Sequence, residues 1–122
     1  MMLRMRRSGL PIESITIGAC IPTQGRALEM MSQLEAVRIK VVCFKPGSVH
    51  GIHAVLEIAA AMPSMIMMLQ CTGGRAGGHH SFEDFHQVTY AAIRRVSNVL
   101  VVVGSGFGNW EDSKQYEGKP QL

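Results

Sequence analysis

The chain has 122 residues, which suits one domain with a single hydrophobic core. Hydrophobic residues make up 47% of the sequence and charged residues 17%, which excludes a disordered tail and a fibre. The net charge is +3, but the arginines cluster in the opening "MMLRMRR" and no basic stripe with interleaved aromatic residues follows. The sequence therefore does not favour binding to nucleic acid.

The cysteines and the apolar runs bear on the compartment. Cys20, Cys43 and Cys71 form no CxxC pair and lie in or beside apolar runs, which is typical of reduced thiols in a cytoplasmic protein. The longest apolar stretch, "VLEIAAAMPSMIMMLQC", is interrupted by Glu57 and Pro63. We therefore expect a cytoplasmic protein without a membrane span.

Apolar β-branched runs alternate with segments of helical spacing from residue 14 onward. The sequence predicts strands at 14–20, 39–45, 65–71 and 98–104, and helices at 25–37, 49–62 and 81–95. Ser48 and Ser81 are predicted to cap the second and third helices at their N-termini. Because the strands are almost continuously apolar, we expect an α/β fold whose parallel sheet is buried on both faces and covered by helices.

Glycine, lysine and histidine residues collect where the predicted strands end. Lys45-Pro46-Gly47 follows the second strand, the 70–80 segment follows the third, and "GSGFG" (104–108) follows the fourth. Parallel α/β folds bind ligands at the carboxyl ends of their strands. The sequence therefore predicts one binding site built from three loops.

The segment "TGGRAGGHHS" after the third strand carries the most specific chemistry. Its glycines allow a ligand to approach the backbone closely: Gly73, Gly74, Gly77 and Gly78. Arg75 offers a forked donor for a phosphate or carboxylate, and His79 and His80 can donate a proton near neutral pH.

Other interpretations of these residues remain open. A metal site could use His79, His80, Asp84 and His86, but adjacent histidines seldom reach the same ion, so we do not expect a metal. One of the paired histidines could instead cap the following helix. The "GSGFG" loop could bind a phosphate through its N–H groups or be a plain turn at the end of a strand.

Four segments together carry a resemblance to a known family. "FKPGSVHGI", "TGGRAGGHHSFEDFHQ", "TYAAIRR" and "VVGSGFG" resemble the enoyl reductase region of the fungal-type (type I) fatty acid synthase β subunit, and "GLPIESITIGACIP" is similar to the lead-in of that region. More distantly, "AGGH" resembles the catalytic loop of FMN-dependent enoyl-ACP reductases and nitronate monooxygenases.

This resemblance implies a TIM-barrel flavoenzyme in which NADPH and FMN reduce an enoyl thioester carried on acyl carrier protein. It implies that His79, or alternatively His80, is catalytic beside the flavin. The implied FMN phosphate loop consists of Gly104, Ser105, Gly106, Phe107 and Gly108, and Lys45 is expected to face the same cleft.

The chain departs from the family in ways that limit its expected activity. Cys71 replaces a usual tryptophan, Cys20 replaces a usual glycine, and the run after Gln87 is shortened. A barrel needs eight βα units and roughly 250 residues, whereas this sequence predicts four strands and three helices, about half of a TIM barrel.

We therefore interpret residues 1–12 as a lead-in, 13–108 as a partial enoyl reductase barrel and 109–122 as a divergent polar tail. The chain is expected to be a fragment that is inactive without the remainder of the synthase chain and its other subunit. The alternative is a small phosphate- or flavin-binding module without redox activity.

Overall fold

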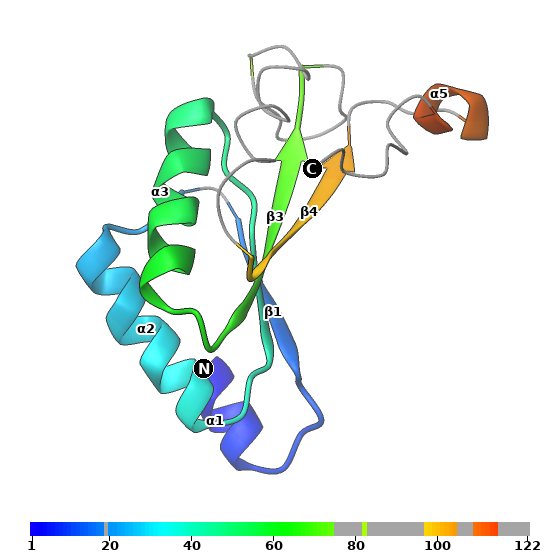
Figure 1. The fold of residues 1–122 in the computed structure, drawn as a ribbon. Coiled ribbons are helices and arrows are strands. Elements are labelled where there is room, and N and C mark those ends of the chain that lie inside the picture. The colour runs from blue at the N-terminus through cyan, green and yellow to red at the C-terminus, as the bar shows by residue number, and fades with distance from the viewer. Residues whose placement is uncertain (19, 75–81, 83–96, 105–108, 115–122) are drawn as a thin grey trace.

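The computed structural model describes residues 1–18, 20–74, 82, 97–104 and 109–114. The elements follow one another as α1 (Met2–Arg7), β1 (Ser14–Ile17), α2 (Gln24–Ala36), β2 (Val41–Phe44), α3 (Val49–Ala61), β3 (Ile66–Thr72), β4 (Val99–Gly104) and α5 (Trp110–Lys114), as Figure 1 shows. None of the helices in these ranges is long and apolar enough to cross a membrane.

The strands form one parallel sheet in the order β1-β2-β3-β4. Thr16, Cys43, Met68 and Leu100 lie in register across all four strands. The predicted α/β fold with four parallel strands is therefore confirmed, as are the helices at 25–37 and 49–62 to within a residue. The predicted helix at 81–95 lies outside the described residues, and closure into a TIM barrel stays a prediction.

The first two strands are shorter than predicted because their ends belong to turns. The Cys20 N–H donates to the Gly18 carbonyl (N···O 3.1 Å), so the chain turns soon after β1 ends at Ile17. At the start of β2, the Ile39 N–H donates to the Leu34 carbonyl and closes helix α2. Apolar composition alone does not distinguish such residues from those of the strand.

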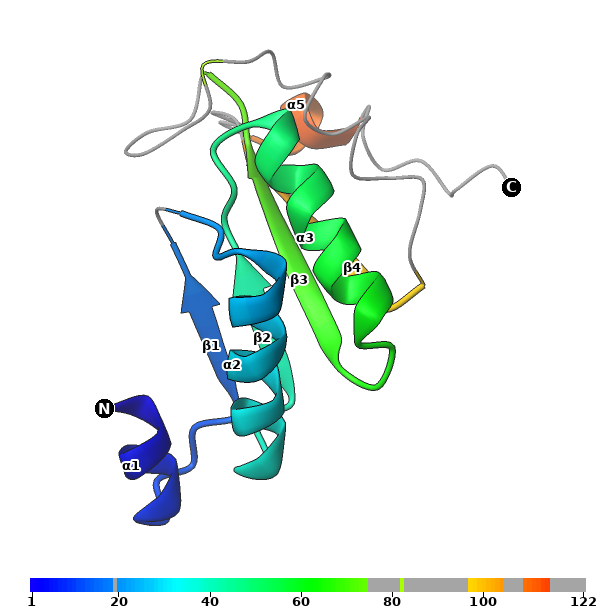
Figure 2. The same ribbon diagram turned by 90° about the vertical axis from the view of Figure 1, so that its left-hand side faces the viewer.

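Both α2 and α3 cover the same face of the sheet, as the two views in Figures 1 and 2 show. The core between them contains Ala27, Met31, Leu34, Ile39, Val42, Phe44, Ile52, Val55, Leu56, Ile58, Ala59, Met65, Met67, Leu69 and Cys71. On the opposite face, Ile66 is 47% exposed and Leu100 55% exposed. The expected burial of both faces is therefore wrong for these strands, because α2 and α3 lie on one side.

The carboxamide of Asn98 joins the start of β4 to the end of α3. Its Nδ2 lies 3.1, 3.0 and 2.9 Å from the carbonyl oxygens of Ala59, Met62 and Met65, respectively. Its backbone carbonyl also accepts a hydrogen bond from Met67 at the start of β3. One residue thus supplies partners for the helix C-terminus and the following turn, groups that a helix cannot satisfy itself.

Two helices end in the same backbone motif with different residues at its left-handed position. In α1, the N–H groups of Gly9 and Leu10 donate to the carbonyls of Arg6 and Met5, and Gly9 has φ +89°. In α2, the N–H groups of Arg38 and Ile39 donate to the carbonyls of Glu35 and Leu34, and Arg38 has φ +62°. These are Schellman motifs, in which glycine is the usual residue at that position.

Arg38 is the only non-glycine residue with positive φ in the described part of the chain. Replacing it with glycine (Arg38→Gly) should raise the free energy of unfolding by about 0.5–1 kcal/mol, because the left-handed conformation is strained for a residue with a Cβ. Gly9→Ala should lower that free energy by a similar amount for the same reason. Urea unfolding of the two variants measures both effects, and a destabilised Arg38→Gly variant would contradict this account.

Candidate functional site

The described part of the candidate site is the edge at which β2, β3 and β4 end. Lys45 follows β2, Gly73 follows β3, and Gly104 is the last residue of β4. Thr72 pairs with Gly104 in the sheet, and the Gly73 N–H donates to the Gly104 carbonyl (N···O 3.3 Å). The parallel sheet therefore brings the predicted loop origins to one edge.

The two glycines that follow β3 differ in burial and in hydrogen bonding. The sequence predicts that glycines after β3 present their backbone to a ligand. Gly73 is buried and uses its N–H for the sheet, whereas Gly74 is exposed. Gly73 therefore extends the pairing between the strands, and Gly74 is the first exposed residue after β3. The cofactor-binding role predicted for both glycines stays a prediction.

A tight connection fixes the path from Lys45 into helix α3. The predicted N-cap is confirmed, since the Ser48 hydroxyl accepts a hydrogen bond from the Gly51 N–H (3.1 Å). A Cβ on Gly51 would lie 2.9 Å from the Cβ of the buried Pro46. Glycine at position 51 thus allows the first turn of α3 to lie directly against the loop that follows β2. Lys45 itself is half-buried, and its N–H continues the sheet by donating to Ile17 (3.1 Å).

Thr72 is a candidate site residue that the sequence analysis did not predict. Its side chain is 6% exposed, and its Oγ1 atom is buried without a hydrogen-bond partner in the part of the chain that the structure describes. A buried hydroxyl in that state costs about 1–3 kcal/mol, so such a group is normally paired. Its position directly before the glycine pair Gly73-Gly74 is the only sequence signal that could have singled out Thr72. Because threonine is common in strands, that signal alone did not indicate a site residue.

The cysteine at the end of β3 has no nucleophilic role in this arrangement. Burial raises the pKa of the Cys71 thiol to about 11, so the thiol stays protonated at neutral pH. Since the thiolate is the reactive form, Cys71 contributes packing rather than chemistry. Burial also raises the pKa of Cys43, whose side chain is on the sheet face opposite α2 and α3.

Most of the predicted catalytic and phosphate-binding residues lie outside the described residues. They are Gly77, Gly78, His79, His80, Ser105, Gly106, Phe107 and Gly108, together with Arg75 and the considered metal ligands Asp84 and His86. Within the described ranges, no group of three His, Cys, Asp or Glu side chains could hold a metal ion. The structure thus brings the predicted residues Lys45, Gly73, Gly74 and Gly104 to one edge of the sheet, together with Thr72, and their functional roles stay predictions.

Comparison with known proteins gives a consistent set of relatives. The chain is 50% identical over 117 residues to a fatty acid synthase β subunit of Monascus ruber, covering 93% of this chain and 6% of the relative. It is 49% identical over 115 residues to the fatty acid synthase β subunit of Schizosaccharomyces pombe, and 44% over 116 residues to that of Saccharomyces cerevisiae. These matches cover 92% of this chain and 5% and 6% of the two yeast proteins, respectively.

A family model also matches residues 66–119, and its description is "Fatty acid synthase subunit beta/Fas1-like, helical". The matched range contains β3, β4 and α5. The fold is that of an α/β segment with a parallel sheet. By sequence, the chain is homologous to one segment of the fungal-type fatty acid synthase β subunit, and it spans only about 6% of the length of such relatives.

The close approach at Gly51 makes a prediction that opposes helix propensity. Gly51→Ala should lower the free energy of unfolding by about 1 kcal/mol, because overpacking against Pro46 (about 1–3 kcal/mol) outweighs the gain of up to about 1 kcal/mol from alanine in a helix. Gly25→Ala in α2 is the matched control, since a Cβ there meets nothing within 4 Å. It should stabilise the protein by up to about 1 kcal/mol. Equal stabilisation by both substitutions in urea unfolding would contradict the proposed contact.

Proposed function

We propose that this chain is part of the FMN- and NADPH-dependent enoyl reductase of a fungal-type fatty acid synthase, acting on enoyl thioesters of acyl carrier protein. One observation carries the proposal: "TGGRAGGHHSFEDFHQ" begins at the end of β3 in a chain whose relatives are fatty acid synthase β subunits. The remainder of the β subunit and the other subunit of the synthase are the proposed partners, and the cytoplasm is the proposed compartment.

The described residues at the strand ends are compatible with a polar cofactor. The Thr72 hydroxyl is buried and lacks a partner among the described residues, and a polar group of a ligand would remove that cost. Gly104 has open space where a side chain would be, so a ligand could approach its backbone. Lys45 carries a positive charge at the same edge, which suits a phosphate.

In the proposed reaction, some residues of the chain would bind the cofactor and another would supply a proton. When bound, FMN would supply the hydride-transfer chemistry between NADPH and the double bond of the substrate. Completing the reduction also requires a proton, and an imidazole can supply one near neutral pH. His79 is the proposed donor, with His80 as its alternative, while Gly104, Ser105, Gly106, Phe107 and Gly108 would hold the cofactor phosphate through backbone N–H groups.

The catalytic role can be tested by placing the segment in an intact enzyme. The 122 residues would replace the homologous segment of a complete fungal synthase, and His79→Ala would then be introduced. Enoyl reduction should fall about 100-fold, since a general acid contributes at least that factor. His53→Ala on α3 is the control, because His53 is exposed and is not proposed for the site. Full activity with His79→Ala but none with His80→Ala would assign the role to the neighbour, and full activity with both would reject it.

The chain alone should bind FMN weakly. FMN must be held at its phosphate and at its ring, and a sheet with an exposed apolar face does not provide the rigid support that such a site needs. In fluorescence titrations, we expect no saturation below about 100 μM FMN and no NADPH oxidation with a crotonyl thioester. Micromolar binding of FMN by a monomer, without turnover, would instead support the small flavin-binding module. Riboflavin is the control that measures the share of the phosphate in any binding.

A further inference from the structure

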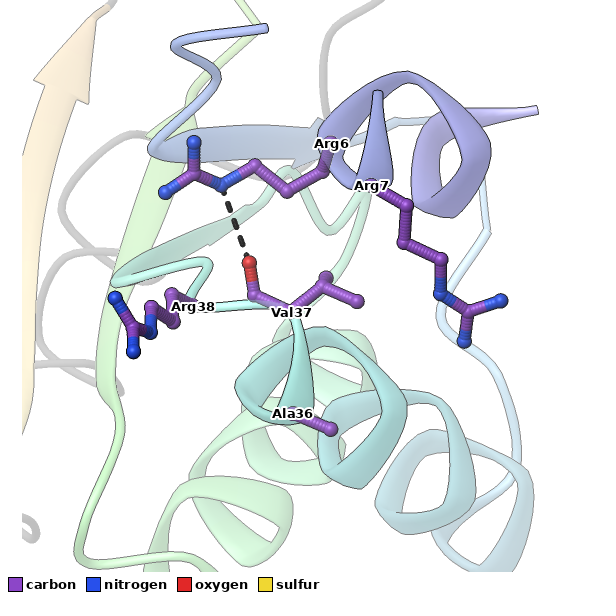
Figure 3. Close-up of a pocket in the computed structure, with 5 residues that line it drawn as sticks. All are labelled: Arg6, Arg7, Ala36, Val37 and Arg38. Carbon is purple, nitrogen blue, oxygen red and sulfur yellow. Dashed lines mark hydrogen bonds between the residues drawn. The ribbon is translucent and has the colours of Figure 1, made fainter. Parts of the chain in front are cut away.

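A basic pocket lies at the opposite end of the sheet, between α1 and the C-terminus of α2. Its volume is about 340 Å³, and Arg6, Arg7, Ala36, Val37 and Arg38 line it, as Figure 3 shows. It shares no residue with the strand ends that carry the candidate site. An inference about it therefore does not depend on the proposed function.

One of the arginines that line this pocket, Arg6, is held in place by hydrogen bonds. Arg6 is half-buried, and its Nε donates to the Val37 carbonyl (3.1 Å). Its Nη1 donates to the Leu10 carbonyl (3.0 Å). These contacts join α1 to the end of α2, where a positive charge is favourable. They also fix the guanidinium group before any ligand arrives, which reduces the entropy that binding would cost.

Arg7 and Arg38 are exposed, and no side-chain hydrogen bond or ion pair is shown for them within the described ranges. Arg38 occupies the left-handed position of a Schellman motif, where glycine would serve the fold better. Among the described residues, the ion pairs are Arg26–Glu29, Lys40–Glu13 and Lys114–Glu111. Arg7 and Arg38 therefore form no ion pair within the described ranges. The nearby carboxylate of Glu13 interacts electrostatically with Arg6 and is itself paired with Lys40, so it offsets the positive charge of this surface only in part.

The directions of the side chains indicate the shape of a suitable ligand. Figure 3 shows Arg6 and Arg38 extending to one side of the Val37 carbonyl and Arg7 extending to the other. The Val37 carbonyl lies at the C-terminus of α2, which carries a partial negative charge. This charge disfavours the binding of one compact anion between the arginines. Carboxylates spaced along an extended chain could reach the separate guanidinium groups, and each group can hold a carboxylate with two hydrogen bonds.

We propose that the surface formed by Arg6, Arg7 and Arg38 is a docking site for a carboxylate-rich polypeptide segment. Charge complementarity and the spread of the three guanidinium groups carry this choice of ligand. The pocket shares no residue with the described strand ends, so its proposed occupancy requires neither flavin nor substrate.

The test is binding of fluorescein-labelled hexaglutamate to the purified chain, measured by fluorescence anisotropy at low ionic strength (about 20 mM). Arg38→Gly and Arg7→Gln should each weaken binding about threefold, the effect of one exposed ion pair. Arg38→Gly keeps the Schellman motif, so weaker binding by this variant does not reflect unfolding. Arg26→Gln is the matched control: it removes the same charge from an arginine already paired with Glu29, and binding should be unchanged.

Three results would overturn the proposal. Equal weakening by Arg26→Gln would show attraction to the net charge alone. Displacement of the peptide by about 5 mM inorganic phosphate, but not by NaCl of equal ionic strength, would show a compact anion site instead. An absence of saturable binding at low ionic strength would reject the docking site altogether.

Discussion

The arrangement of the whole chain depends on the parallel pairing of consecutive strands. When each strand lies beside the previous one in a parallel sheet, each connection must cross back over the sheet, and crossovers strongly prefer one hand. When successive strands are added at the same edge of the sheet, crossovers of one hand all pass over the same face. This explains why α2 and α3 cover one face while Ile66, Leu100 and Val102 are exposed on the other. A barrel segment has this arrangement, but so does any open sheet whose crossovers lie on one side.

The same constraint gives the two ends of the sheet different chemistry. At the carboxyl end, the chain leaves the strands through Lys45, Gly73 and Gly104, with a partnerless buried hydroxyl on Thr72 among the described residues. At the amino end, side chains instead satisfy carbonyl groups. Asn98 donates to the end of α3, and Arg6 donates to the end of α2. The amino end thus uses Asn98 and Arg6 for stability, whereas no side-chain hydrogen bond or ion pair among the described residues gives Arg7 or Arg38 such a role.

The sequence predicted the elements of the sheet because their signals are local. Four apolar runs, the serine before α3 and the spacing of apolar residues in α2 and α3 each specify an element without knowledge of its neighbours. The convergence of Lys45, Gly73 and Gly104 followed from one further rule, that the carboxyl ends of parallel strands share an edge.

Features that arise from long-range contacts were not predicted. Asn98 contacts residues 33 to 39 positions away, and Arg6 contacts Val37 across 31 positions. The segment of helix α1 was interpreted as a lead-in. A helix of six residues is stable only when it packs against other elements, and its own sequence does not show such contacts. The left-handed backbone of Arg38 was also missed, because the sequence signal for a Schellman motif is glycine. Thr72 was overlooked for a different reason, since only three-dimensional structure shows that its hydroxyl has no hydrogen-bond partner among the described residues.

At the end of β3, two adjacent glycines that look equivalent in the sequence differ in the structure: one pairs within the sheet and the other is exposed. Gly73 still belongs to the sheet, because its N–H pairs with Gly104, whereas Gly74 is exposed and makes the first step away from it. The loop after β3 and the loop after β4 therefore start from adjacent, hydrogen-bonded residues. A ligand that contacts both loops would therefore lie close to the hydrogen-bonded residues Gly73 and Gly104. Thr72 lies directly before Gly73 and pairs in register with Gly104, and its hydroxyl has no partner in the part of the chain that the structure describes. A ligand at this point could supply that hydrogen bond.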